Sequence, residues 1–185
     1  MPYPAKISSE SILEKAAEMV EAEGADQFSM QRLAAALGVK APSLYRYFPS
    51  KTDLLRALNL QTVQQMIAGL HAAAANGGDA RRQLLAMSRA WRAFAHANPL
   101  AYALAFADPN PELRPDEQLL EALAIPIQQV MAGISGEERS LAALRGLWAL
   151  LHGFTLLELS GQFRRGGDLE DAFFQSVEAY LKGWG

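Results

Sequence analysis

The sequence has no cysteine. This absence excludes disulfide bonds, thiolate metal sites and a cysteine nucleophile, and it is typical of a reducing compartment. The N-terminal stretch MPYPAKISSE lacks the apolar core of a signal peptide. The most apolar long stretch, residues 141–163, is interrupted by Arg145, His152 and Glu158. A membrane span disfavours charges near its centre, so we expect a buried helix, a cytoplasmic location and no membrane partner.

Recognisable catalytic motifs are also lacking. The chain contains no phosphate-binding loop, no G-x-S-x-G and no H-E-x-x-H. Acidic residues near 137 and 168 stand at expected helix starts, where they favour the helix dipole without any catalytic role. His71 and His96 are too isolated in the sequence to indicate a metal site. We therefore predict a protein that is not an enzyme and that uses no cofactor and no metal.

Alternation of apolar and polar residues, the mark of a half-buried strand, is absent from the chain. Apolar residues instead recur at helical spacing, and glycine, asparagine and proline separate the periodic segments. We predict an all-α fold with about nine helices, near residues 8–23, 29–37, 41–47, 50–75, 79–97, 100–107, 115–134, 137–163 and 169–184.

Residues 38–51, GVKAPSLYRYFPSK, contain no acidic residue, although the whole chain has a net charge of −3. Residues 27–56 carry a net charge of +4, from one acidic residue, Asp53, and the basic residues Arg32, Lys40, Arg46, Lys51 and Arg56. Such a basic region on an acidic protein indicates a face that meets an anion, although a solvated charged face explains the charge equally well.

The same region has the pattern of a helix-turn-helix, in which the second helix enters the DNA major groove. The apolar positions that we expect to face the first helix and Phe28 are Leu33, Ala34, Leu37, Val39, Leu44 and Phe48. Polar, basic and small residues then remain outside, where they can bind phosphates and base edges. Lys51 begins a helix, so its ammonium and the terminal amides can face one phosphate.

Residues 28–55, FSMQRLAAALGVKAPSLYRYFPSKTDLL, resemble the DNA-binding domain of tetracycline-repressor-type (TetR) transcriptional regulators. The matching features are a cap at Ser29, the pair Leu33–Ala34, Leu37–Gly38–Val39, LYRYF at residues 44–48, and Lys51. Two residues depart from the common pattern: Pro42 replaces a glycine and Tyr47 replaces a histidine. Both departures alter the contact surface, so the operator sequence cannot be taken from relatives.

The resemblance implies a DNA-binding domain over residues 1–50 and a helical ligand-binding and dimerisation domain over residues 51–185. It implies a homodimer, most simply a repressor, that binds double-stranded operator DNA with a palindromic sequence and responds to a small-molecule effector. Repression and activation both remain open, as does a protein–protein adaptor that has lost DNA binding. The predicted DNA-binding residues are Ser29, Met30, Gln31, Lys40, Ala41, Pro42, Ser43, Tyr45, Arg46, Tyr47 and Lys51.

A second resemblance covers residues 147–163, LWALLHGFTLLELSGQF, where Trp148, His152 and Gly153 are similar to the Trp-His-Gly signature of one C-terminal domain subtype. Large rings among many alanines, with few inward charges, predict a site for an apolar or aromatic effector. The candidate lining is Trp91, Phe94, Tyr102, Phe106, Met131, Trp148 and His152, although residues of these types at helical spacing are more often plain core.

The stretch after Leu141 is apolar nearly all round the helix, so one side should pack within the chain and the other on a second copy. The last helix adds further apolar positions. We expect the two helices to form a two-fold, four-helix interface. The predicted dimer-interface residues are Leu147, Leu150, Phe154, Leu157, Phe173, Val177, Tyr180 and Trp184.

Overall fold

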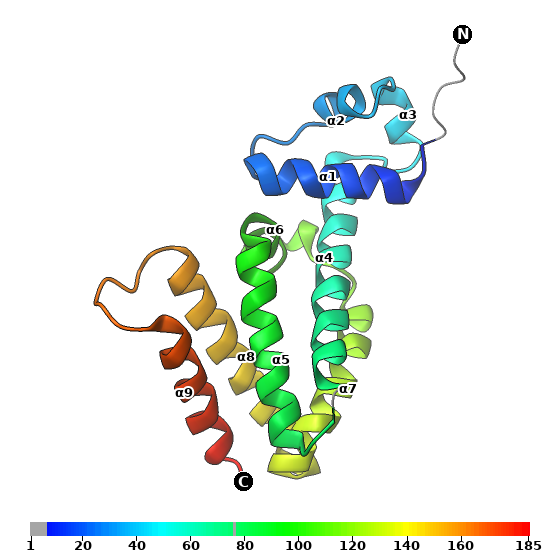
Figure 1. Cartoon of the computed structure of the whole chain (residues 1–185). Helices are drawn as coiled ribbons and strands as arrows, with labels where there is room; N and C mark the ends of the chain where they lie inside the picture. Colours follow the sequence, from blue (N-terminus) through cyan, green and yellow to red (C-terminus); the bar gives the residue numbers. More distant parts are fainter. Residues whose placement is uncertain (1–6, 76) are drawn as a thin grey trace. The chain divides into compact units, whose positions relative to one another are not determined.

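The computed structural model describes residues 7–75 and 77–185 (Figure 1). In these two ranges all regular structure is helical and no strand is present, which confirms the predicted all-α fold. The elements are α1 (Ser9–Glu23), α2 (Met30–Ala36), α3 (Ala41–Tyr45), α4 (Lys51–Ala74), α5 (Ala80–Ala97), α6 (Pro99–Phe106), the 3-10 helix η1 (Pro111–Leu113), α7 (Glu117–Ser135), α8 (Glu137–Leu159) and α9 (Leu169–Lys182).

The chain forms two compact units, which group the helices differently from a division after residue 50. The first unit contains residues up to 63 together with 98–115, and the second contains residues 64–97 and 116–185. Helix α6 and η1 join the first unit because Leu104 and Leu113 are buried in the same cluster as Leu54 and Leu58 of α4. Helix α4 therefore contributes residues to both units.

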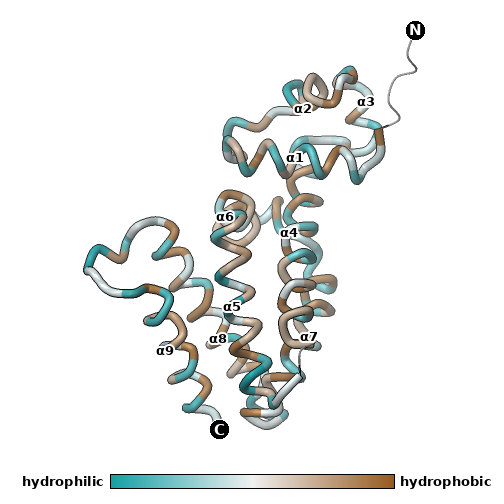
Figure 2. Tube along the Cα trace, viewed as in Figure 1, coloured by the Kyte–Doolittle hydropathy of each residue, from teal (hydrophilic) through white to brown (hydrophobic). Residues whose placement is uncertain are grey.

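The core of the first unit is built on one stripe of α1. Ile12, Ala16 and Val20 of that stripe are completely buried. Leu33 of α2 and Leu44 of α3 pack into the same cluster and are also completely buried. These are the faces that the helical spacing predicts. Hydrophobic and hydrophilic residues are mixed along each helix, as expected for elements with one face in a core (Figure 2).

Serine side chains cap the N-termini of three of the helices in this unit. Ser8 caps α1 in a reciprocal pair with Ser11, and Ser29 accepts from the backbone N–H of Arg32 at the start of α2. Ser50 accepts from the N–H of Asp53 at 3.0 Å, as the motif Ser-Lys-Thr-Asp predicts for the start of α4. Such caps satisfy backbone donors that have no partner within the helix.

Helix α6 is attached to α1 by a carboxylate. The two oxygens of Glu21 accept hydrogen bonds from the first free N–H groups of α6, those of Leu100 at 3.2 Å and Ala101 at 3.0 Å. A negative charge is favourable at this end of a helix because the unpaired N–H groups give it a partial positive charge. Glu21 thus fixes the N-terminus of α6 on the helix that carries the core of the first unit.

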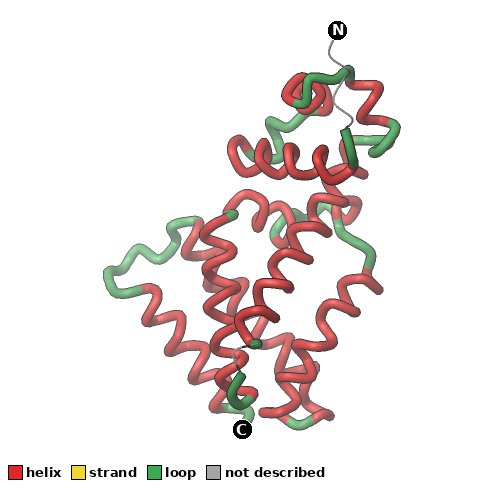
Figure 3. The backbone as a smooth tube through the Cα atoms, turned by 45° about the vertical axis from the view of Figure 1, so that its right-hand side comes forward, coloured by secondary structure: helices red, strands yellow, loops and turns green. Residues whose placement is uncertain are grey.

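Helices α5, α7, α8 and α9 pack against one another in the second unit. The loop from residue 160 to 168 separates α8 from α9 (Figure 3). Helix α8 ends at Leu159, four residues before the predicted end. Gly161 ends the helix in a left-handed conformation, with a φ of 66°. The N–H of Gln162 then donates to the carbonyl of Leu157 at 2.8 Å, and that of Gly161 donates to the carbonyl of Glu158 at 3.0 Å.

Helix α8 meets the length and composition of a membrane span, but a third of its most apolar 18-residue window is buried inside the protein. Its Glu158 forms ion pairs with side chains of α5. These contacts agree with the expectation of a core helix on one side of α8. Outside this buried face the helix carries exposed apolar residues, including Leu141 and Leu157.

Helices α8 and α9 approach each other closely at Gly146. The hydroxyl of Tyr180 on α9 donates to the carbonyl of Ala143 at 2.8 Å and lies over the Cα of Gly146. A Cβ at position 146 would collide with this hydroxyl and would lie 2.9 Å from Cζ of the ring. Only glycine therefore allows the tyrosine to occupy this place.

The substitution Gly146→Ala should destabilise the second unit. Overpacking of a filled site costs about 1–3 kcal/mol, whereas alanine gains only about 1 kcal/mol over glycine in helix propensity. Gly153→Ala is the matched control on the same helix, because a Cβ there meets nothing within 4 Å. Thermal unfolding should show a lower Tm for the first variant and an unchanged or higher Tm for the second. Equal shifts would contradict the close approach.

Candidate nucleic-acid interface

The helix-turn-helix has the local geometry that its sequence predicts. Helix α2 ends at a turn in which Gly38 adopts a φ of 67°, a left-handed conformation that disfavours other residues. The N–H of Val39 donates to the carbonyl of Ala34 at 2.9 Å and closes this turn. Helix α3 begins at Ala41, and Pro42 stands in its first turn, where a missing N–H leaves no bond unmade.

Most predicted DNA-binding residues lie at the surface. Tyr45 and Tyr47 are 47% and 41% exposed, although tyrosine is usually more buried. Gln31, Lys40, Pro42 and Arg46 are exposed, and Ser29, Ala41, Ser43 and Lys51 are half-buried.

Met30 is the exception among the predicted DNA-binding residues. Its side chain is 5% exposed and packs in the core of the first unit. The prediction of a surface contact for Met30 is therefore wrong. The sequence already indicated that Met30 is buried, because its spacing to Leu33, Ala34 and Leu37 places it on the same apolar face of a helix. Phe48, at 8% exposed, is a core residue as predicted.

Three of the five basic residues of this region are engaged within the protein. Arg32 pairs with Glu23 and donates to a backbone carbonyl. Arg56 pairs with Asp53 at 3.2 Å and donates to the carbonyl of Glu112 at 2.7 Å. The ammonium of Lys51 donates to two backbone carbonyls. The net charge of +4 therefore overstates the charge that is available to a ligand.

Lys40 and Arg46 are the two remaining basic residues. In the described part of the chain, the side chain of neither residue forms a hydrogen bond or an ion pair. They flank α3, Lys40 as its N-cap and Arg46 as its C-cap. Tyr47, which follows, donates its hydroxyl to the carbonyl of Ile7 at 2.8 Å and keeps its oxygen as an acceptor. The exposed face around α3 thus presents two cations and two phenol rings without a nearby carboxylate partner.

The seven candidate effector-site residues fall in both compact units. Tyr102 and Phe106 belong to the first unit, where their rings lie 4.9 Å apart. Trp91, Phe94, Met131, Trp148 and His152 belong to the second. The rings of Trp91 and Trp148 lie 6.4 Å apart on facing helices. Burial lowers the pKa of His152, so this side chain is neutral at pH 7.

Two other arrangements bear on ligand binding. A surface groove of about 480 Å³ lies at the loop before α9, lined by Gln162, Phe163, Arg164, Arg165 and Leu169, and it contains none of the seven candidates. Among the described residues, no three histidine, aspartate or glutamate side chains gather as a metal site would require.

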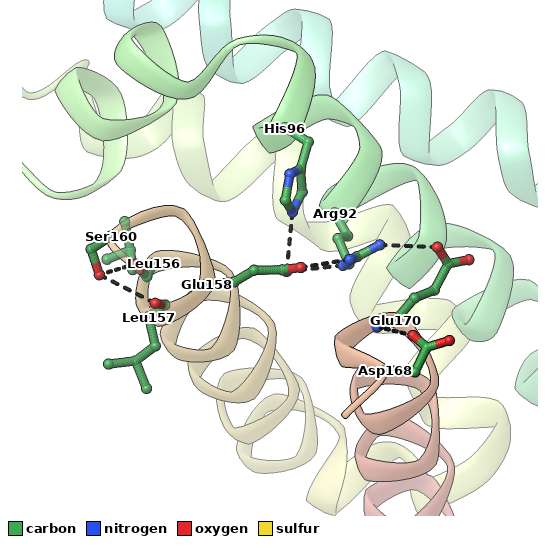
Figure 4. Close-up of polar contacts among 8 residues, drawn as sticks. All are labelled: Arg92, His96, Leu156, Leu157, Glu158, Ser160, Asp168 and Glu170. Carbon is green, nitrogen blue, oxygen red and sulfur yellow. Dashed lines mark hydrogen bonds and ion pairs between the residues drawn. The ribbon is translucent and has the colours of Figure 1, made fainter. Parts of the chain in front are cut away.

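A charged network in the second unit was not predicted from the sequence (Figure 4). Arg92 of α5 binds the carboxylate of Glu158 of α8 through two nitrogens, at 3.0 and 2.6 Å. His96, one turn later on α5, places Nε2 3.0 Å from the same carboxylate. Arg92 also lies 3.4 Å from Glu170 at the start of α9. Arg92 lies 66 and 78 positions before its two carboxylate partners in the sequence, so no local pattern could have revealed the network.

The network neutralises a buried charge. The side chain of Glu158 is 8% exposed and that of Arg92 is 17% exposed. Burial alone raises the pKa of Glu158, but hydrogen bonds from Arg92 and His96 outweigh it, so the pKa lies below its ordinary value. The hydrogen bond to Glu158 likewise raises the pKa of Arg92. Glu158 therefore carries a negative charge at neutral pH inside the domain.

The predicted dimer-interface residues divide into two groups. Leu147, Phe173 and Val177 are buried inside one protein chain, so the prediction that they meet a second copy is wrong. Their helical spacing identified an apolar face correctly, but this face packs within the second unit. Leu157 is exposed, and Leu150, Phe154, Tyr180 and Trp184 keep part of their surface accessible.

The ion pair of Arg92 predicts a characteristic dependence of stability on pH. Arg92→Met leaves Glu158 buried without its main partner, which costs about 3–5 kcal/mol. In the native protein the pKa of Glu158 is lowered, so its contribution is complete above about pH 4.5 and is lost as the pH falls further. In the variant the pKa of Glu158 should rise, and acidification towards pH 5 should recover stability.

Thermal unfolding between pH 4 and 8 measures both effects. Arg89→Met is the matched control, because Arg89 lies on the same helix and its guanidinium contacts only the ring of Phe174 among the described interactions. We expect a small, pH-independent change in Tm for this control. Equal losses in the two variants would argue against the buried ion pair.

Comparisons with known proteins agree with this geometry. Residues 12–58 match the family "Bacterial regulatory proteins, tetR family", and residues 84–180 match "Tetracyclin repressor-like, C-terminal domain". An uncharacterized HTH-type transcriptional regulator of Mycobacterium tuberculosis, Rv0681, is 36% identical over 165 residues, which cover 85% of this chain and 73% of that protein.

Solved structures share the fold at low sequence identity. A protein of unknown function from Rhodococcus sp. RHA1 superposes with a TM-score of 0.83 at 22% identity, covering 100% of this chain and 98% of the other. A TetR variant from Acinetobacter baumannii in complex with minocycline has a TM-score of 0.73 at 22% identity, covering 96% of each chain. From the two family matches and the mycobacterial relative, the chain belongs to the TetR family of transcriptional regulators, which bind DNA through a helix-turn-helix and are not enzymes.

Proposed function

We propose that this regulator is a cytoplasmic homodimeric repressor, which binds a palindromic operator and is released by a small apolar or aromatic effector. The observation that carries the DNA-binding part is the face around α3, where Lys40 and Arg46 have no acidic partner and Tyr45 and Tyr47 are exposed. Cations bind phosphates, and the hydroxyl of Tyr45 can donate to them, so this face suits a DNA backbone and groove.

The surface of α8 and α9 supports the homodimer. Only a third of the most apolar window of α8 is buried, and Leu141 and Leu157 are 43% and 45% exposed. Small residues occupy other exposed positions of the two helices, among them Ala149 on α8 and Ala179 on α9. Small side chains let helices of two copies approach closely, while the larger leucines supply apolar area. A two-fold axis through this surface yields a closed dimer.

A two-fold axis has a consequence for the operator. It relates the α3 helices of the two copies, so each copy reads one half-site of an inverted repeat. The half-sites are then spaced by about one helical turn of DNA, or by a multiple of it.

The second unit supports an effector of low polarity. Trp91 and Trp148 bring two large rings together, and His152 is neutral because of its burial. Arg92 and Glu158 neutralise each other, so the buried charges of the unit demand no charged ligand. The Acinetobacter TetR structure contains minocycline in a protein of the same fold. This likeness supports the proposal that a small molecule binds here.

Two connections between the units can couple effector binding in the second unit to DNA binding by the first. Helix α4 begins with Lys51 in the first unit and continues without interruption into the second. Helix α5 of the second unit continues through Asn98 into α6, whose N-terminus is bound by Glu21 of α1. An effector that favours a dimer with wrongly spaced α3 helices lowers the affinity of the protein for its operator. Binding of the operator must then lower the affinity for the effector by the same factor.

Selection of bound duplexes from a random DNA library tests the proposal. We expect the purified protein to recover an inverted repeat whose half-sites are one or two helical turns apart. A Leu157→Glu variant, which places a charge on the proposed dimer surface, should sediment as a monomer and lose the repeat. Recovery of single half-sites by the unaltered protein would refute the dimer. Failure of a folded dimer to recover any sequence would favour the adaptor alternative.

The contact between Glu21 and α6 gives a separate prediction. Glu21→Gln removes the charge that binds two backbone donors, and loss of such a cap costs about 0.5–2 kcal/mol. Amide hydrogen exchange at Leu100 and Ala101 should accelerate by about tenfold, and affinity for the selected duplex should change. Glu14→Gln, on an exposed face of the same helix, is the control and should change neither. Faster exchange with unchanged affinity would show that α6 is not coupled to the DNA-binding surface.

A further inference from the structure

The loop between α8 and α9 forms a groove that the proposed DNA and effector sites do not use. The groove has a volume of about 480 Å³, within the range of small-molecule sites in proteins. Its lining consists of Gln162, Phe163, Arg164, Arg165 and Leu169, and most of its surface is apolar. All five residues belong to the loop and the first turn of α9 (Figure 1). The groove therefore combines two positive charges with apolar surface.

Hydrogen bonds fix both ends of this loop. The N–H of Gln162 donates to the carbonyl of Leu157 at 2.8 Å, at the end of α8. The carboxylate of Asp168 accepts from two backbone N–H groups at the start of α9, at 2.9 and 3.1 Å. Arg164 and Arg165 lie between these two anchored ends. A loop that is already ordered loses less conformational entropy when a ligand binds to it, so affinity is gained.

The apolar part of the groove rests on the core of the second unit. Phe163 is half-buried, and its ring lies 4.7 Å from that of Phe154. The ring of Phe154 in turn lies 5.2 Å from that of Phe173, which is completely buried. Leu169, the first residue of α9, is also half-buried. Phe163 and Leu169 thus keep part of their apolar surface accessible, and packing on the core holds the ring in place.

The guanidinium groups of Arg164 and Arg165 have no partner in the described part of the chain. Both side chains are exposed, and neither forms a hydrogen bond or an ion pair there. Two other arginines of this unit are engaged, since Arg92 pairs with two carboxylates and Arg89 lies over the ring of Phe174. An anion can therefore bind Arg164 and Arg165 without breaking an existing contact.

Three carboxylates follow the loop at the start of α9, and each is already engaged. Asp168 accepts from the backbone N–H groups of the helix. Glu170 pairs with Arg92 at 3.4 Å (Figure 4). Asp171 accepts from the side-chain amide of Gln175 at 2.7 Å. The partner of the two loop arginines is therefore an anion that this part of the chain does not supply.

We propose that this groove binds a small apolar molecule that carries a carboxylate. The carboxylate accepts hydrogen bonds from Arg164 and Arg165, whose planar guanidinium groups match it in shape and charge. The apolar part of the ligand covers Phe163 and Leu169, which supply the hydrophobic contribution to affinity. This site differs from the proposed effector site, whose ligand has low polarity. Binding here requires neither the dimer nor the operator.

Amide NMR spectra of the full-length protein test the proposal with three probes. Phenylbutyrate carries both the carboxylate and an apolar part, acetate carries only the charge, and phenylbutanol carries only the apolar part. We expect phenylbutyrate to shift the amides of residues 161–169 until saturation. Acetate and phenylbutanol should each bind in the groove about tenfold more weakly, because each lacks one of the two contributions.

The double variant Arg164→Gln/Arg165→Gln removes both charges and keeps polar side chains. Its affinity for phenylbutyrate should fall by about tenfold, with an unchanged Tm because both residues are exposed. Arg145→Gln is the matched control, since Arg145 of α8 is also exposed and has no ion pair in the described chain. The control should bind phenylbutyrate as the unaltered protein does.

Three results would overturn the proposal. If phenylbutyrate leaves the amides of residues 161–169 unshifted, the groove is not its site, and shifts elsewhere in the second unit would assign it to the effector site instead. Equal binding of acetate or phenylbutanol would show that the groove does not select a molecule with both parts. Undiminished affinity of the double variant would exclude the two arginines. The comparison of probes uses the unaltered protein, so it decides even if the variant does not fold.

Discussion

The DNA-binding surface depends on the burial of two very short helices against α1. Helices α2 and α3 have seven and five residues, and helices of this length are not stable alone in water. Their geometry is imposed by Leu33 and Leu44, which are completely buried against the apolar stripe of α1. Because these side chains fill the core, Tyr45 and Arg46, which directly follow Leu44, point outward. The exposed phenol rings are therefore a consequence of the packing.

The charges of this surface are fewer than composition suggests. Basic residues near the helix-turn-helix serve two purposes that a sequence count cannot separate. Arg32 and Arg56 pair with nearby acids, and Lys51 satisfies backbone carbonyls, so these three shape the unit. Lys40 and Arg46 flank α3 and carry the charge that faces outward. Steep salt dependence should therefore come from few positions, which concentrates the electrostatic contribution around the recognition helix.

Local sequence patterns were sufficient to predict the helices, but they were insufficient to predict which surfaces the helices pack against. The all-α fold, the cap at Ser50 and the core role of Phe48 follow from spacing and residue type, which act within a few residues. Helical periodicity also placed Phe173 and Val177 on an apolar helix face. It does not determine whether such a face packs within one chain or against another. Both are buried inside the protomer. The network of Arg92 and Glu158 depends on the packing of α5 on α8, and no spacing along the chain encodes that packing.

The same limit explains how α8 can serve two surfaces. An apolar helix with a single buried face would leave its other face exposed to water, at a cost that grows with area. Glu158 shows that the inward face near the end of α8 is fixed by charge as well as by apolar packing, since its pairing with Arg92 and His96 determines which side turns towards α5. Gly146 fixes the approach of α9 at the other half of the helix. With the inward face set at two points, Leu141 and Leu157 are directed away from the protomer core. The rotation of α8 thus determines which of its apolar residues remain exposed.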